Sequence, residues 1–154
     1  MTLANLLSQS QIVPDLVSDE RWAAIAELLD CLVKAGKISA ADRGDVLASI
    51  RQREETMSTG IGFGIAIPHA SSDKVQEVVA AFGRSVKGVQ FDSLDEQPVF
   101  FIVLFVVPKD QFQTHLRTLA AIAKFLNDKA VRDDLGHAPD AAALLRVFEN
   151  RSTR

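Results

Sequence analysis

Three observations predict a single domain of the α/β class. The chain has 154 residues, 47% of them hydrophobic, and a chain of this length can bury roughly 68–70% of its unfolded surface in one core. Apolar residues recur at helical spacing over 22–33 and again over 112–126. Between these two stretches, the continuous apolar runs 78–82 and 99–107 are typical of buried strands.

The N-terminal third is expected to hold an edge strand and two helices. The segment 11–16 is a candidate edge strand, weakened by Pro14. Ser18 is the expected N-cap of the first helix, which ends at Gly36. Ser39 and Asp42 have the spacing of a capping box, and the helix that they open continues towards Arg53.

Apolar runs and capping residues also predict the elements in the rest of the chain. The run 99–107 lies between Pro98 and Pro108 and predicts a central strand buried on both faces, whereas 83–95 is expected to be turn-like. A helix is expected to open at Asp110 and Gln113. A last helix is expected from about residue 139 to 148, so the domain spans 1–150 and the remaining residues, 151–154, form a loose tail.

Composition argues against several classes of protein. The formal charge is -3, and the chain has no cluster of Lys and Arg that could bind nucleic acid. The longest apolar run, 99–107, is far shorter than a membrane span. With Cys31 as its single cysteine and no signal-peptide pattern, the chain is expected to be cytoplasmic, with no disulfide and no membrane insertion.

The segment Ser58-Thr59-Gly60-Ile61-Gly62-Phe63-Gly64-Ile65-Ala66-Ile67-Pro68-His69 is the most informative part of the chain. Closely spaced glycines allow backbone N–H groups to converge on a phosphate, although they can equally serve tight turns. The dinucleotide fingerprint fails here, because Ile65 takes its last glycine position and a strand pattern follows Gly64. A Walker-type phosphate loop is absent as well, since no Gly-Lys-Ser/Thr occurs.

His69 is the leading candidate for chemistry. A neutral imidazole has a free nitrogen nucleophile near pH 7, although a histidine after a proline is more often a loop residue. His69 ends an apolar run that should hold its backbone, and Ser71 supplies a hydroxyl beside it.

The other two histidines receive different interpretations. His115 lies on the inward face of the helix expected from Asp110, either as a core residue or as a donor to a phosphate. His137 is expected in a surface loop. A metal site built on His69 and His115 lacks a third ligand at suitable spacing, so no metal and no cofactor is expected.

Several motifs in order carry a resemblance to a known family. Arg53-Glu54-Glu55, the glycine-rich segment ending at Pro68-His69, Gly88-Val89-Gln90-Phe91-Asp92 and Thr114-His115-Leu116 together resemble the fructose/mannitol-type enzyme IIA components of the bacterial phosphoenolpyruvate-dependent phosphotransferase system (PTS). The likeness covers nearly the whole chain, and the nitrogen-regulatory branch is the most similar. It implies a mixed β-sheet with helices on both faces.

The resemblance also implies a phosphocarrier. His69 would accept a phosphoryl group from a histidine-phosphorylated carrier protein (HPr-like), with His115 as its active-site partner and Arg53 as the nearby cation. Phosphate-binding or site-shaping roles would fall to the remaining motif residues Thr59, Gly60, Gly62, Gly64 and Ser71. The phosphoryl group would then pass to a IIB domain or serve as a regulatory mark read by target proteins.

The sequence departs from the family pattern at two positions beside the motif. Phe63 stands where the family usually has a small or polar residue such as Asn, and Ala70 replaces a common glycine. Neither change removes a reacting group. Both bear on the identity of the partner, which the sequence leaves open between a sugar-specific IIB protein and a regulatory target.

Overall fold

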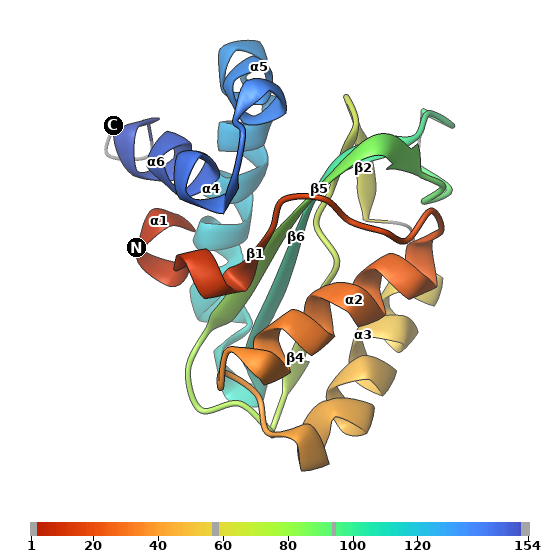
Figure 1. The fold of residues 1–154 in the computed structure, drawn as a ribbon. Coiled ribbons are helices and arrows are strands. Elements are labelled where there is room, and N and C mark those ends of the chain that lie inside the picture. The colour runs from red at the N-terminus through yellow and green to blue at the C-terminus, as the bar shows by residue number, and fades with distance from the viewer. Residues whose placement is uncertain (1–2, 57–58, 94, 152–154) are drawn as a thin grey trace.

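A six-stranded mixed sheet separates two layers of helices in the computed structural model, which describes residues 3–56, 59–93 and 95–151. The strands are β1 (Ile12–Val13), β2 (Gly60–Gly62), β3 (Ile65–Ala66), β4 (His69–Ser72), β5 (Val79–Val89) and β6 (Val99–Pro108). The helices are α1 (Leu3–Leu6), α2 (Arg21–Lys34), α3 (Arg43–Thr56), α4 (Leu116–Asn127), α5 (Lys129–His137) and α6 (Ala141–Arg151). Figure 1 shows α2 and α3 on one side of the sheet and the other four helices on the opposite side.

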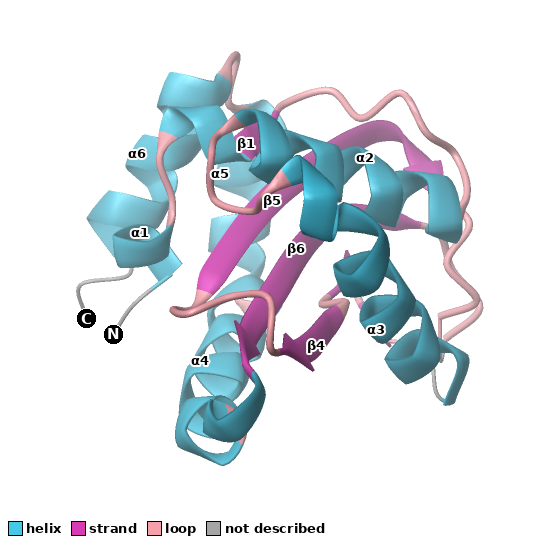
Figure 2. Cartoon of the chain, turned by 90° about the horizontal axis from the view of Figure 1, so that it is seen from below, coloured by secondary structure: helices cyan, strands magenta, loops and turns pink. Residues whose placement is uncertain are grey.

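The strand β6 is the centre of the sheet. The strands follow the order β1-β5-β6-β3-β2, and β4 also pairs with β6. β5 runs antiparallel to β6, whereas β3 and β4 run parallel to it. Figure 2 shows β4 beside β6, below α3. The expected mixed sheet with helices on both faces is therefore confirmed.

Alternating side chains of β6 divide the core into two halves. Ile102, Leu104 and Val106 pack with α2 and α3, whereas Phe101, Val103, Phe105 and Val107 pack with α4, α5 and α6. Each of these seven side chains is buried. The expectation that the apolar run 99–107 is a strand buried on both faces is thus confirmed, and the reason is the helical layer on each side.

Two helix starts differ from the sequence expectation. Glu20, and not Ser18, caps α2, because its carboxylate accepts hydrogen bonds from the N–H groups of Trp22 and Ala23. The hydroxyl and N–H of Ser18 are both donated to Glu27 instead. Two 3₁₀ turns, Lys109–Gln111 and Gln113–His115, occupy the expected first turns of the helix from Asp110, so that α4 begins at Leu116.

Three other expectations are corrected. β5 extends to Val89, although 83–95 was expected to be turn-like, because the ladder with β6 continues through Arg84 and resumes at Val89. His137 ends a helix, α5, whose N-cap Asp128 accepts from the N–H of Ala130. Arg151 belongs to α6 and pairs with Asp134 instead of starting a loose tail, and residues 152–154 lie outside the described residues.

Candidate functional site

His69 is the first residue of the edge strand β4. Pro68 precedes it, and its backbone pairs in parallel register with Phe105 of β6. The carbonyl of Pro68 accepts a hydrogen bond from the N–H of Phe105 at 3.0 Å. The side chain of His69 is 7% exposed, so the sheet and its surroundings hold the imidazole in one place.

One hydrogen bond defines the tautomer of this imidazole. Nδ1 of His69 lies 2.7 Å from the carbonyl oxygen of Ile67. A carbonyl oxygen can only accept, so Nδ1 carries the hydrogen and donates it. In the neutral ring Nε2 then keeps its lone pair and is the nitrogen available as a nucleophile.

A cavity of about 370 Å³ opens beside His69, between α3 and Phe112, which follows β6. Arg53 from α3 and Ser71 from β4 share this cavity with the imidazole, so the structure brings together three of the residues expected from sequence. The cavity is lined by Ser49, Gln52, Arg53, Thr56, His69, Ala70, Ser71 and Phe112.

The surroundings keep His69 uncharged. Burial lowers the pKa of the imidazole below its usual 6.5 by penalising the charged form, and the positive charge of Arg53 acts in the same direction. The hydrogen bond to Ile67 and the carboxylate of Glu54 oppose these effects, but the net direction is downward. The ring is therefore neutral, with a free Nε2, at neutral pH.

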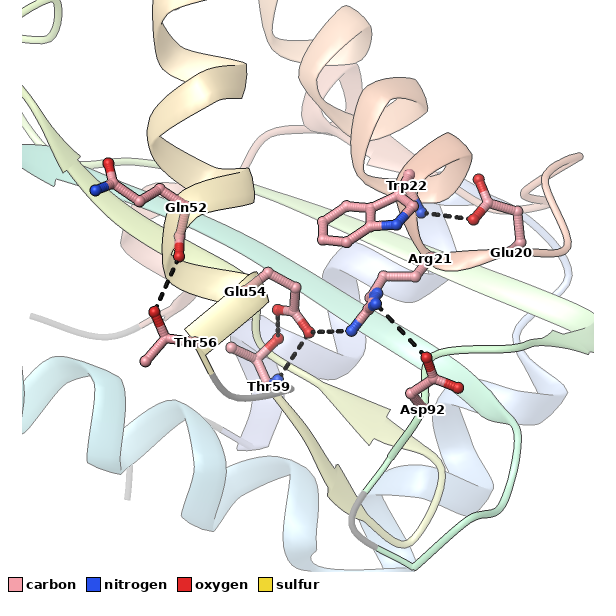
Figure 3. A network of polar contacts seen from close by, with 8 residues as sticks. All are labelled: Glu20, Arg21, Trp22, Gln52, Glu54, Thr56, Thr59 and Asp92. Atoms are coloured by element: carbon pink, nitrogen blue, oxygen red, sulfur yellow. Dashed lines mark hydrogen bonds and ion pairs between the residues drawn. The ribbon is translucent and has the colours of Figure 1, made fainter.

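Thr59 belongs to a network of polar contacts drawn in Figure 3. Its hydroxyl donates to Oε1 of Glu54 at 2.5 Å, and its N–H donates to Oε2 at 3.0 Å. Arg21 of α2 lies 3.5 Å from the same carboxylate and 3.5 Å from Asp92. Thr59 is thus bound to a buried carboxylate and is not among the residues that line the cavity.

His115 lies at the N-cap of α4, at the far end of the 3₁₀ segment. Its ring meets the ring of Phe105 edge-on at a centroid distance of 6.4 Å. Because Phe105 is the register partner of His69, both histidines lie over the same part of β6. Nε2 of His115 is 3.4 Å from Oε1 of Gln111, and His115 is not one of the described residues that line the cavity.

The glycines lie in the hairpin β2–β3, some distance along β6 from His69. Gly60 and Gly62 belong to β2, and Gly64 follows in the turn to β3. β3 meets β6 at Phe101, four residues from the partner of His69, which is roughly 13 Å along an extended strand. The turn needs its glycines because Gly62 and Gly64 have φ of 100° and 77°.

The two departures from the family pattern lie in different places. Phe63 is 66% exposed in this turn and has a φ of 58°, a left-handed conformation that Asn adopts more readily than Phe. The guanidinium of Arg132 lies 5.3 Å from the centre of its ring. Ala70 is buried in β4 next to His69.

The sequence interpretation gave no site role to five residues: Ser49, Gln52, Glu54, Thr56 and Phe112. Ser49, Gln52 and Thr56 recur every three or four residues along α3 and so share one face, a polar stripe that could have been read from the sequence. Glu54 follows Val46 and Ile50 at intervals of four, and all three are buried. A carboxylate at a core position of a helix was the available signal for Glu54.

Residues 3–56, 59–93 and 95–151 contain neither a candidate metal site nor a candidate membrane-spanning helix. No group of three or more His, Cys, Asp or Glu side chains in these ranges is arranged to hold a metal ion. No helix within them combines the length and the apolar character needed to cross a bilayer.

Residues 5–151 match the family model described as phosphoenolpyruvate-dependent sugar phosphotransferase system, EIIA 2. The chain belongs to this family. Members of the EIIA 2 family are phosphotransfer components of the PTS, and the expected phosphocarrier class is thereby confirmed.

Two curated relatives represent two roles within the family. This EIIA 2 chain is 39% identical over 112 residues to a PTS fructose-specific EIIA component of Haloferax volcanii, covering 73% of this chain and 71% of the relative. It is 31% identical over 148 residues to a nitrogen regulatory protein of Bradyrhizobium diazoefficiens, covering 96% and 95% of the two chains. Both the fructose-specific and the nitrogen-regulatory interpretation fit these matches.

Solved structures show the same EIIA 2 fold. The crystal structure of the nitrogen regulatory protein IIA-Ntr from Neisseria meningitidis matches with a TM-score of 0.85 and 29% identity, covering 95% of this chain and 98% of that one. Mannitol enzyme IIA of Escherichia coli, in complex with phosphorylated enzyme IIB, matches with a TM-score of 0.78 over 94% and 98% of the chains. At 20% identity, this second likeness concerns the fold alone.

Proposed function

We propose that His69 accepts a phosphoryl group on Nε2 from a histidine-phosphorylated, HPr-like carrier protein, and that the chain passes it on or uses it as a regulatory mark. One observation carries the proposal. The 2.7 Å hydrogen bond from Nδ1 of His69 to the Ile67 carbonyl leaves Nε2 as the unprotonated nitrogen of a neutral ring beside an open cavity.

The transfer balances without a further reactant. A P–N bond forms between the phosphorus and Nε2 of His69, while the P–N bond to the donor histidine breaks and the donor nitrogen keeps the electron pair. Phosphoryl transfer asks mainly for positioning and charge stabilisation. The phosphorylated ring gains roughly two negative charges, and the guanidinium of Arg53 in the same cavity offsets them.

The remaining site residues have distinct roles in this proposal. The hydroxyl of Ser71, which lines the cavity, donates to a phosphoryl oxygen. His115, whose ring meets the Phe105 ring edge-on, is the second histidine of the site. Thr59 and the glycines shape the backbone that leads to His69 and do not bind phosphate themselves.

The nitrogen-regulatory role is the first of two candidate outcomes. The match to the Bradyrhizobium diazoefficiens nitrogen regulatory protein spans nearly all of both chains, and IIA-Ntr has a TM-score of 0.85. In this role the phosphorylated and unphosphorylated forms bind target proteins with different affinities. The proposal includes a cytoplasmic location, which the single cysteine favours.

Transport is the second candidate outcome. The 39% identity to a fructose-specific EIIA component favours onward transfer to a separate IIB protein for fructose/mannitol-type uptake. The two outcomes share the chemistry at His69 and differ only in what receives the phosphoryl group.

Reconstitution tests the phosphoryl transfer. The purified chain is incubated with phosphoenolpyruvate, enzyme I and HPr, and its mass is measured before and after acid treatment. We expect one acid-labile phosphate on the wild type and none on His69→Ala. His137→Ala is the matched control, because His137 is exposed at the end of α5, and it should be phosphorylated like the wild type. Phosphate on His69→Ala would contradict the proposal.

A second step separates the two outcomes. The phosphorylated chain is mixed with purified fructose-type and mannitol-type IIB proteins, and loss of label from His69 is followed over time. Onward transfer supports the sugar-specific role. Retention of the label, together with a change in affinity for a nitrogen-regulatory target on phosphorylation, supports the regulatory role.

A further inference from the structure

The carboxylate of Glu54 is the most deeply buried charge near the site, and the phosphoryl transfer itself does not use it. Its side chain has 0% exposure, on the face of α3 that also carries Val46 and Ile50. An ionised carboxylate at such a position is costly unless charges and hydrogen bonds compensate it. A core residue of this kind therefore needs a specific reason for its charge.

Among the residues that the structure describes, the Thr59 hydroxyl, the Thr59 N–H and the Arg21 guanidinium compensate this carboxylate. The hydroxyl and the N–H of Thr59 both donate to it, one to each oxygen, at 2.5 Å and 3.0 Å. The guanidinium of Arg21 lies 3.5 Å from Oε2 and is itself only 18% exposed. Glu54 thus holds the backbone and the side chain of Thr59 at once, as Figure 3 shows.

The chain of contacts continues from Thr59 to the imidazole. The carbonyl oxygen of Thr59 accepts a hydrogen bond from the N–H of Ile67 at 3.1 Å. The carbonyl oxygen of Ile67 in turn accepts from Nδ1 of His69 at 2.7 Å. Glu54 is therefore linked to the Nδ1 hydrogen bond of His69 through two residues. Thr59 precedes the glycine-rich hairpin, and Ile67 follows it.

We propose that Glu54 is a positioning residue that orients the Ile67 carbonyl through Thr59 and so holds His69 as its Nδ1–H tautomer. The inference rests on the proposed role of His69 as phosphoryl acceptor. Its consequence is that the hydrogen bonds made by Glu54, and not only its charge, keep Nε2 free for the phosphoryl group.

Arg21 is the outer anchor of this arrangement. Its guanidinium connects the buried Glu54 to Asp92, whose side chain is 83% exposed, with nitrogen to oxygen distances of 3.5 Å to each carboxylate. The same guanidinium lies 4.2 Å from the centre of the Trp22 ring, which restricts its position. Arg21 therefore offsets the charge of Glu54 from the side opposite to Thr59.

The substitution Glu54→Gln tests the proposal, with Glu55→Gln as the matched control. Glu55 is the next residue of α3 and is exposed, so its substitution changes net charge equally and leaves the buried contacts intact. The readout is the ¹⁵N NMR signature of the two His69 ring nitrogens in the unphosphorylated protein. We expect a mixture of both tautomers in Glu54→Gln and the Nδ1–H form alone in the wild type and in Glu55→Gln.

The rate of phosphorylation is the second readout. We expect it to fall roughly 10–100-fold in Glu54→Gln, by analogy with the loss caused by removing a group that orients a metal-bound histidine, and to stay within twofold of wild type in Glu55→Gln. If Glu54 acted through charge alone, its removal would lower the pKa of His69 and leave the tautomer unchanged. An unchanged tautomer in folded Glu54→Gln overturns the proposal.

A second variant keeps the test valid if Glu54→Gln does not fold. Thr59→Val preserves the shape of the side chain and the N–H bond to Glu54 while removing the hydroxyl bond. A tautomer mixture in this variant supports the proposal, and a pure Nδ1–H form overturns it. The tautomer of His69 is measured in the unphosphorylated protein, so this measurement does not depend on phosphoryl transfer. The proposed function is decided separately, by whether His69→Ala abolishes phosphorylation.

Discussion

The ring of Phe112 lies nearly parallel to the imidazole of His69, with 6.0 Å between the ring centroids and 12° between the planes. Phe112 lies between the two 3₁₀ turns that follow β6 and is half-buried. It lines the same cavity as His69 and thereby keeps water from one face of the imidazole. Burial lowers the pKa of His69, and we expect part of this desolvation to come from Phe112, a residue outside the glycine-rich motif.

The first prediction concerns pH. Since the pKa of His69 in the folded chain is below 6.5, the unfolded chain binds this proton more tightly, and His69 costs stability as pH falls below that value. We expect the wild type to lose more stability than His69→Gln when urea unfolding is compared at about pH 7 and about pH 5.5. An NMR titration of His69 with a midpoint at or above 6.5 would contradict the premise.

Phe112→Ala should expose the imidazole. Water then solvates the charged form, so the pKa of His69 rises towards 6.5 and less neutral ring is present under mildly acidic conditions. Phe112→Leu keeps an apolar cover over the ring and serves as the control. The NMR midpoint of His69 should follow the order wild type, Phe112→Leu, Phe112→Ala, and an identical midpoint in all three would show that Phe112 has no part in the desolvation.

The left-handed turn at Phe63 gives a prediction about stability. Phe63→Asn and Phe63→Ala both remove the ring that faces Arg132, so their difference isolates the backbone with φ of 58°. Asn tolerates this conformation, which costs most other residues roughly 1–2 kcal/mol. We expect Phe63→Asn to be about 1 kcal/mol more stable than Phe63→Ala in urea unfolding. Equal stability of the two variants would rule out strain at this position.

Two glycine substitutions should change stability in opposite directions. A Cβ at Gly60 would lie 2.4 Å from Oγ of Ser93 and 3.0 Å from its Cα, so Gly60→Ala must displace backbone, and we expect it to cost about 1–3 kcal/mol. A Cβ at Gly44 on α3 meets nothing within 4 Å, so Gly44→Ala should stabilise the protein by about 0.5 kcal/mol. Thermal unfolding of both variants measures this difference, and a neutral Gly60→Ala would disprove the clash.

Much of the fold could be predicted because the apolar pattern is strong where the core is continuous. The run 99–107 is apolar at every position, which only a strand covered on both faces or a buried helix explains, and the flanking Pro98 and Pro108 favour a strand. The end of β5 was missed because Gly83 and Gly88 are typical of turns. Gly83 instead lies where Leu16 and Leu28 approach the strand so closely that a Cβ would not fit.

The site was predictable where residues adjacent in sequence act together, and not where the fold combines distant ones. His69 and Ser71 belong to one strand, and the motif around Arg53 pointed to the cavity. The role of the glycines stays a prediction, and the sequence did not reveal that the hairpin places them away from His69 along β6. Glu54 belongs to the motif read from the sequence but was given no role, because its contacts run through Thr59 to Ile67, whose alignment no local pattern reveals.

The pairing of β4 has a consequence for the rate at which the protein would receive and pass on a phosphoryl group. β6 is the one strand that pairs with β4 among the strands that the structure describes, and α3 packs against β4 as well. In the proposed transfer, a docking domain reaches the imidazole through the cavity that α3 and Phe112 line, and no pair of strands has to separate. Turnover then depends on how often two already folded bodies collide in a productive orientation, about 10⁵–10⁷ M⁻¹s⁻¹ for typical protein pairs, and not on any opening of the architecture.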